Sequence, residues 1–202
     1  MTLEGKKIAF GITASFCTVM DILEPMKALC ALGADIYPVF SNEVQTQSSR
    51  FHDKNELINS IQKITQKDVI STIAGAEPMG PKNPMDIMVI APATGNTIAK
   101  LANGIWDTPV LTAAKATLRN NKPVLLAIFT NDALGINGVN IMKLYNTKNI
   151  YFVPFGQDDP FNKPTSMTSN LSVLTESIIC ALDSKQIQPS ITTFSEKIIP
   201  TL

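Results

Sequence analysis

The sequence predicts an α/β protein, with a three-layer αβα arrangement in which a mostly parallel, Rossmann-like sheet carries helices on both faces. Short apolar runs of strand length alternate along the chain with segments whose apolar residues recur at helical spacing. Such an alternation is typical of parallel strands that are covered on both faces. The clearest junction is residues 86–102, where an apolar strand stops at Pro92, a short polar loop follows, and a helical pattern begins at Thr97.

The strands are predicted from apolar runs bounded by turn residues. The first run ends at Gly11. The second contains Pro38, which cannot donate a hydrogen bond to a neighbouring strand and therefore favours an edge position. We predict strands at residues 8–10, 36–40, 69–73, 86–91, 124–128 and 150–153.

The helices are predicted from apolar residues at a spacing of three and four. The first helical pattern runs from Val19 to Leu29, and Gly33 is suited to the left-handed conformation that closes many helices. Asp107 or Thr108 is expected to cap a helix with Pro109 in its first turn. Further helices are predicted at 56–65, from Thr97, and at 171–182, and loops at 74–84 and 154–165.

Length and composition indicate one globular domain, which we place at residues 1–183, followed by a polar tail at 184–202. Basic and acidic residues number 17 each and form no basic stripe, so nucleic acid is not an expected partner. No apolar stretch is long enough to cross a membrane and no secretory signal is evident, so we expect a cytoplasmic protein without a membrane partner. The three cysteines form no metal-ligand pattern, and no metal site is expected.

Three polar loops follow predicted strands, and the carboxyl ends of parallel strands meet at one edge of a sheet. These loops are residues 11–15, 41–42 and 93–97. Their small side chains, hydroxyls and backbone N–H groups suit a phosphate. The first loop lacks the G-x-G-x-x-G spacing, and no acidic residue ends the second strand, so a dinucleotide fingerprint is absent. The pattern alone is equally compatible with ordinary turns and helix caps.

The third loop carries a specific resemblance. Residues 92–105, P-A-T-G-N-T-I-A-K-L-A-N-G-I, closely resemble the P-A-S-A-N-T-I-A-K-x-A-x-G-I/L motif of the flavoprotein family of homo-oligomeric flavin-containing cysteine decarboxylases and flavin prenyltransferases. Residues 11–15, G-I-T-A-S, resemble that family's G-x-T-G-S loop, and the resemblance extends over residues 5–180. It implies a flavodoxin-like sheet, bound FMN and a homo-oligomer.

The resemblance also implies roles for individual residues. Ser15 and Ser41 are expected at the FMN phosphate, and the third loop along the ribityl chain and ring. Asn131 is the expected catalytic residue, because it stands where the decarboxylases have the asparagine of a P-x-M-N motif that contacts the substrate carboxylate. Residues 158–167 match a substrate-covering flap. The expected cofactor-binding residues are Gly11, Thr13, Ala14, Ser15, Ser41, Ala93, Thr94, Gly95, Asn96 and Thr97.

Several departures argue against cysteine decarboxylation. Glu77 and Pro78 stand where the decarboxylases have a catalytic histidine, the P-x-M-N motif has become I-F-T-N at 128–131, and the flap has no cysteine. Gly95 replaces the usual alanine of the third loop. Segments within 73–81, 130–135 and 156–167 resemble instead a branch of the family that acts with a separate NAD(P)-binding protein to oxidise a small dicarboxylate.

Alternative functions stay open from the sequence. The chain is either part of such a two-component oxidoreductase, a stand-alone FMN-dependent decarboxylase or prenyltransferase, or a non-catalytic component with a vestigial flavin site. Lys163 is the obvious basic residue that a prenyl phosphate would require. Asp158 and Asp159 are candidates for holding a cation or a substrate, or form a solvated turn, and His52, the only histidine, is expected at the surface.

Overall fold

The computed structural model describes residues 3–15, 17–48 and 53–192. Its seven-stranded sheet has the order β2-β1-β3-β4-β7-β6, and β5 also pairs with β4. The first five strands are mutually parallel, whereas β6 and β7 are antiparallel additions. The strands are β1 (Lys7–Ile12), β2 (Asp35–Phe40), β3 (Ile87–Ala93), β4 (Val124–Thr130), β5 (Ile150–Phe152), β6 (Phe155–Gly156) and β7 (Met167–Ser169).

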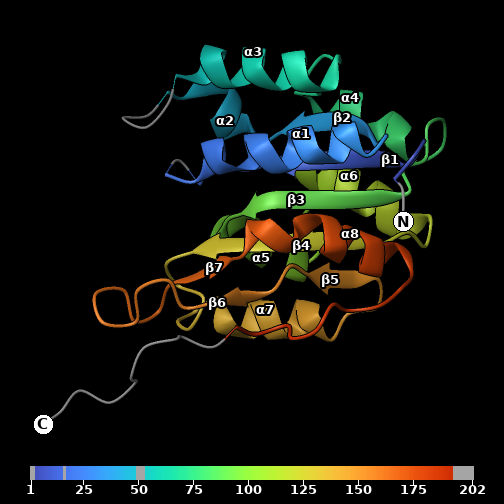
Figure 1. Cartoon of the computed structure of the whole chain (residues 1–202). Coiled ribbons are helices and arrows are strands. Elements are labelled where there is room, and N and C mark those ends of the chain that lie inside the picture. Colours follow the sequence, from blue (N-terminus) through green and yellow to red (C-terminus); the bar gives the residue numbers. More distant parts are fainter. Residues whose placement is uncertain (1–2, 16, 49–52, 193–202) are drawn as a thin grey trace, which may run out of the picture.

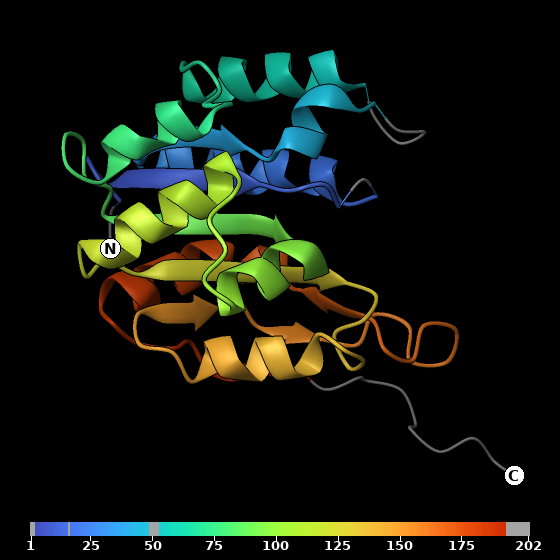
Figure 2. The same ribbon diagram turned by 180° about the vertical axis from the view of Figure 1, so that it is seen from behind.

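Helices cover both faces of this sheet (Figures 1 and 2). Residues on β3 show why, since Met88 and Ile90 belong to one core cluster and Ile87 and Val89 to the other. The first cluster packs under α4–α7, and the second under α1, α3 and α8. The helices are α1 (Leu23–Ala31), α2 (Asn42–Thr46), α3 (Lys54–Thr65), α4 (Ile73–Ala76), α5 (Gly95–Ala102), α6 (Pro109–Arg119), α7 (Gly138–Tyr145) and α8 (Leu174–Leu182), with short 3₁₀ turns η1 (Val19–Ile22), η2 (Glu77–Met79) and η3 (Leu171–Val173).

The predicted fold class is confirmed, as is the edge position of the strand that contains Pro38. Of the two candidate caps for α6, Thr108 is the actual one, because its hydroxyl accepts a hydrogen bond from the Leu111 N–H at 3.2 Å. Asp107 instead pairs with Lys100 at 2.8 Å.

The junction at the end of β3 differs from the prediction. The strand does not stop at Pro92 but continues to Ala93, because the register with β4 shifts between Ile90 and Ala93 and such an irregularity tolerates a proline. The helix begins at Gly95 rather than Thr97. Glycine and asparagine are weak helix formers, so the first turn of α5 gives little helical signal in the sequence.

Other elements were predicted incorrectly or missed. The strand predicted at 69–73 is reduced to a single bridge between Ile70 and Val39, and Ile73 already begins α4. Helix α7 was missed because exposed apolar residues such as Val139 and Met142 obscure its amphipathic pattern. Strands β6 and β7 have two and three residues, too few for a periodic signal.

Residues 184–192 follow the edge of the sheet beyond α8. Gln186 exchanges hydrogen bonds with the backbone of Phe152, and Ile191 forms a bridge with Phe155. A boundary between a domain and a tail at residue 183 stays a prediction, and residues 193–202 lie outside the described part of the chain. Among the described residues, no helix is long and apolar enough to cross a membrane.

The sheet has its topological switch point between β1 and β3, since the chain leaves β1 toward β2 on one side and returns to β3 on the other. The loops after β1 and β3 therefore flank a crevice at the carboxyl edge, where ligands bind in open α/β sheets. Strand β4 extends this edge, because its first half pairs with β5 and its end, at Phe129 and Thr130, pairs with β7.

Gly11 shows how tightly α6 packs beneath this edge. A Cβ atom added at Gly11 would lie 2.6 Å from Met88 Cε and 2.8 Å from Val110 Cγ1. We predict that Gly11→Ala lowers the free energy of unfolding by about 1–3 kcal/mol through overpacking. Denaturant unfolding measures this loss. Gly135→Ala is the control, because its added Cβ would meet only ordinary contacts from 3.4 Å outward. Equal stability of the two variants would contradict the packing argument.

Candidate functional site

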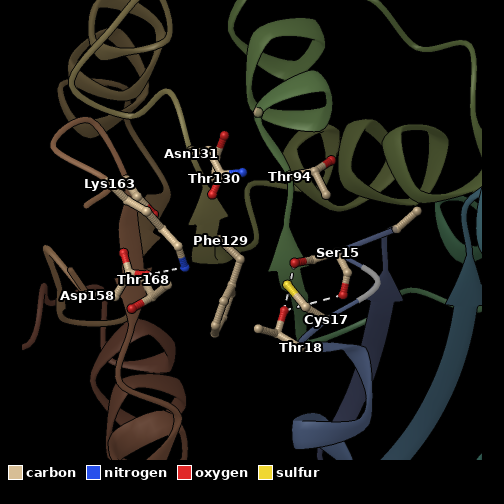
Figure 3. Close-up of a pocket in the computed structure, with 13 residues that line it drawn as sticks. Ser15, Cys17, Thr18, Thr94, Phe129, Thr130, Asn131, Asp158, Lys163 and Thr168 are labelled. Atoms are coloured by element: carbon tan, nitrogen blue, oxygen red, sulfur yellow. Dashed lines mark hydrogen bonds and ion pairs between the residues drawn. The ribbon is translucent and has the colours of Figure 1, made fainter. Parts of the chain in front are cut away.

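A cavity of about 420 Å³ opens at the carboxyl edge (Figure 3). Four segments form it: the loop after β1, the start of α5, the end of β4 with its loop, and the segment from Asp158 to Thr168. These segments are far apart in the sequence and meet because their strands are parallel neighbours or pair through β7. The lining residues are Ala14, Ser15, Cys17, Thr18, Thr94, Gly95, Phe129, Thr130, Asn131, Asp158, Lys163, Ser166 and Thr168.

One buried hydroxyl locks the loops after β1 and β3 together. Thr13 is 2% exposed, and its Oγ1 donates to the Pro92 carbonyl at 2.7 Å and accepts from the Thr94 N–H at 3.1 Å. Both hydrogen bonds cross the switch point. Thr13, which was predicted to bind the cofactor, therefore uses its side chain to fix the geometry of the site.

Two of the helices that begin at this edge follow a serine or a threonine that does not cap them. Helices α3, α4 and α6 each start after a residue whose side chain accepts from the first turn. Helices α2 and α5 start after Ser41 and Thr94, which have the same extended backbone, but neither hydroxyl caps its helix. Because the first N–H groups of a helix lack intrahelical partners, an external acceptor is favoured at both ends.

The Ser41 hydroxyl is the one buried side-chain polar atom without a hydrogen-bond partner among the described residues. A buried hydroxyl in this condition is unfavourable unless a ligand or water bonds to it. Ser41 is held beside the end of β1, since its N–H donates to the Ile12 carbonyl at 3.0 Å. An orphaned hydroxyl and an uncapped helix at the same position fit an anionic group such as a phosphate.

The predicted residues divide into two groups. Ala14, Ser15, Thr94, Gly95 and Asn131 line the cavity. Gly11, Thr13, Ser41, Ala93 and Thr97 are buried behind the edge, and Asn96 is exposed on the first turn of α5. Glu77 lines a separate hollow with Lys115 and Arg119, and His52 lies outside the described residues.

Gly95 is required by a polar cluster that the sequence did not reveal. Thr130 Oγ1 and Asn137 Nδ2 both donate to the Asp132 carboxylate, the second at 2.7 Å. A Cβ on residue 95 would lie 2.6–2.8 Å from atoms of these three side chains. The sequence did contain one signal for this cluster, which is the glycine that replaces the alanine of the family motif. A glycine at this position indicates that other side chains occupy the space of the alanine methyl group.

The segment opposite this cluster is an ordered flap. Thr165 Oγ1 donates to the Asn131 carbonyl at 2.6 Å, and the Leu134 N–H donates to the Thr165 carbonyl at 3.0 Å. The backbone and side-chain N–H groups of Asn162 donate to Asp159 Oδ1 and hold the pKa of that carboxyl below its usual value. Asp159 therefore organises the flap, whereas Asp158 faces the cavity. The described residues contain no cluster of three or more metal-ligating side chains.

The loop after β1 contributes the predicted Ser15 hydroxyl together with Thr18 and Cys17, which no sequence pattern singled out. Ser15 Oγ and Thr18 Oγ1 are hydrogen-bonded at 2.7 Å, and Cys17 lies beside them. Phe129 forms the apolar part of the cavity wall (Figure 3). The cavity therefore combines a ring-sized apolar surface with several hydrogen-bonding groups.

Comparison with known proteins identifies relatives along nearly the whole chain. Residues 1–186 match the family model described as Flavoprotein. The B subunit of dipicolinate synthase from Bacillus subtilis (strain 168) is 50% identical over 188 residues, which cover 93% of this chain and 94% of the relative. The crystal structure of the corresponding dipicolinate synthase B subunit from Bacillus halodurans C has a TM-score of 0.89 at 49% identity and covers 96% of this chain and 99% of its own. The FMN-dependent cysteine decarboxylase SpaF shares the fold, with a TM-score of 0.66 at 18% identity and coverage of 89% and 99%.

The Thr13 bridge is tested by removing its hydroxyl at constant volume. Thr13→Val leaves the buried Pro92 carbonyl and the half-buried Thr94 N–H without their partner, and we expect a loss of about 1–3 kcal/mol in unfolding free energy. Thr13→Ser keeps the hydroxyl and is expected to lose less. Thermal unfolding of both variants measures the difference. A valine variant as stable as the serine variant would show that the Thr13 bridge does not contribute to the stability of the fold.

The fit between Gly95 and the Asp132 cluster is tested by a double-mutant cycle. We expect Gly95→Ala alone to lower unfolding free energy by about 1–3 kcal/mol, because its methyl group displaces hydrogen-bonded atoms. In an Asp132→Ala background the alanine at position 95 meets a loosened cluster, so the additional loss is predicted to be smaller. Strictly additive losses in denaturant unfolding would contradict this coupling.

Proposed function

The chain belongs to the Flavoprotein family, and from that premise we propose that it is the B subunit of a dipicolinate synthase. In this proposal it holds FMN and acts with an NAD(P)-binding A subunit to oxidise dihydrodipicolinate to dipicolinate in the cytoplasm of a sporulating bacterium. The observation that carries the proposal is the 50% identity to the B subunit of a dipicolinate synthase over almost the full length of both chains. We also expect a homo-oligomer.

The residues at the carboxyl edge fit FMN. The orphaned Ser41 hydroxyl and the uncapped start of α2 suit its phosphate, with Ser15 as a further donor. The uncapped start of α5, with Thr94 at the cavity wall, suits polar atoms of the flavin. When bound, FMN would supply a hydride acceptor, while the chain supplies orientation and electrostatics.

The cavity also suits the substrate, a six-membered ring with two carboxylates. Phe129 offers an apolar surface to the ring, and the Asn131 amide can donate to a carboxylate. The flap from residue 158 to 167 is fastened to the Asn131 loop through Thr165, so it can exclude water from a bound ring. Aromatisation of the ring drives the loss of hydride.

The hydride acceptor is either flavin on this chain or nicotinamide on the partner protein. The residues of this chain have the same task in both cases, because each requires the ring to be held with its carboxylates fixed and its reactive carbon uncovered. The partner protein would then contribute the NAD(P) site. This chain lacks the dinucleotide-binding fingerprint that such a site requires.

The proposal predicts that dipicolinate forms only when both proteins are present. The assay follows dipicolinate production from the dihydro substrate with each protein alone and with the reconstituted pair. Asn131→Ala is expected to lower kcat/KM of the pair at least about tenfold, or about 1.4 kcal/mol of transition-state binding, without changing Tm. Asn55→Ala, an exposed position on α3, is the control. Equal rates from the A subunit with and without this chain would overturn the proposal.

A further inference from the structure

The cavity contains one ion pair that the proposed function does not yet use. Lys163 is the one basic residue and Asp158 the one acidic residue among the described residues that line it. All other lining side chains are neutral. Figure 3 shows the Lys163 ammonium group pointing into the cavity beside Thr168, on the side opposite Ser15 and Thr18. Among the described lining residues, these two groups therefore provide the formal charges with which a charged ligand can interact.

The ion pair is loose. Lys163 Nζ lies 3.6 Å from Asp158 Oδ2, whereas charge-assisted hydrogen bonds are about 2.7–2.9 Å long. The two side chains are 57% and 27% exposed, so water screens their attraction and the pair contributes little to stability. An incoming carboxylate that makes a short hydrogen bond to the ammonium group can therefore replace Asp158.

The backbone that carries Lys163 is nevertheless fixed. Its N–H donates to the Asp159 carbonyl at 2.8 Å, and its own carbonyl accepts from the Ser166 N–H at 3.0 Å. Thr165 ties the same segment to Asn131. The backbones of Lys163 and Asn131 thus belong to one hydrogen-bonded unit, and both residues line the same cavity, one with a cation and the other with a neutral donor.

From these contacts we propose that Lys163 is the specificity-determining residue for a ring dicarboxylate, and that Asp158 holds its ammonium over the cavity until a substrate carboxylate takes its place. The cavity is neutral while the pair is intact, so the second carboxylate of the ligand must bind to a neutral donor such as the Asn131 amide. The proposal rests on the proposed function only for the identity of the ring. It requires no redox step.

The test is isothermal titration of the purified chain with pyridine-2,6-dicarboxylate, and with pyridine-2-carboxylate as the single-carboxylate probe. Lys163→Met keeps an apolar stem without the charge, and we expect it to bind the dicarboxylate at least tenfold more weakly than the wild type, with a reduced dependence on salt. Lys163→Arg is expected to retain most of the affinity. Asp158→Asn removes the competing anion, so we expect unchanged or tighter binding. Lys148→Met, at an exposed position before β5, is the matched control.

Two results would overturn the inference: no binding of the dicarboxylate to the wild-type chain, or equal affinity of Lys163→Met and Lys148→Met. A kinetic measurement on the reconstituted pair separates this inference from the proposed function. If the pair makes dipicolinate and Lys163→Met leaves KM unchanged, Lys163 has no role in binding. If the wild-type chain binds the dicarboxylate through Lys163 but the pair makes no dipicolinate, the binding site stands and the proposed reaction is wrong.

Discussion

The site depends on one buried hydroxyl at the switch point of the sheet. Thr13 joins the end of β1 to the end of β3, because a single oxygen donates to the Pro92 carbonyl and accepts from the Thr94 N–H. Thr94 is also the residue from which α5 starts, so this bridge sets the position of that helix end. With Thr13 occupied by protein partners, the Ser41 hydroxyl has no hydrogen-bond partner among the described residues, and α5 starts without a side-chain cap. The geometry of the cavity follows from this division.

Much of the scaffold was predictable from the sequence, for identifiable reasons. Buried parallel strands produce continuous apolar runs in the sequence. A helix cap such as Thr108 is recognised as a hydroxyl residue directly before a proline in the first turn of the helix. The end of β3 was not predictable, since the register shift that allows Pro92 inside a strand arises from pairing with β4. Helix α7 was missed for a different reason. Its exposed face carries Val139 and Met142, so no amphipathic stripe marks it.

The candidate site was predictable only in outline. The polar loops at strand ends indicated the edge at which the cavity opens, and the resemblance to a family motif named residues along it. Which side chains point into the cavity depends on long-range contacts. Thr13 is turned away into its bridge, while Thr18, Phe129 and Lys163 reach the cavity from segments that no local pattern connects. The sequence showed that Gly95 replaces the alanine of the family motif. The reason for this replacement, the Asp132 cluster that occupies the space of a methyl group, is seen only in the structure.

The assignment of FMN to the carboxyl edge of this sheet underlies the proposed function. The visible absorption spectrum of the purified chain, after addition of FMN and removal of free flavin by gel filtration, tests it. We expect the flavin bands to remain with the protein, at close to one FMN per chain. A colourless protein after this treatment would contradict the assignment and would leave the orphaned Ser41 hydroxyl and the uncapped helices α2 and α5 without a ligand.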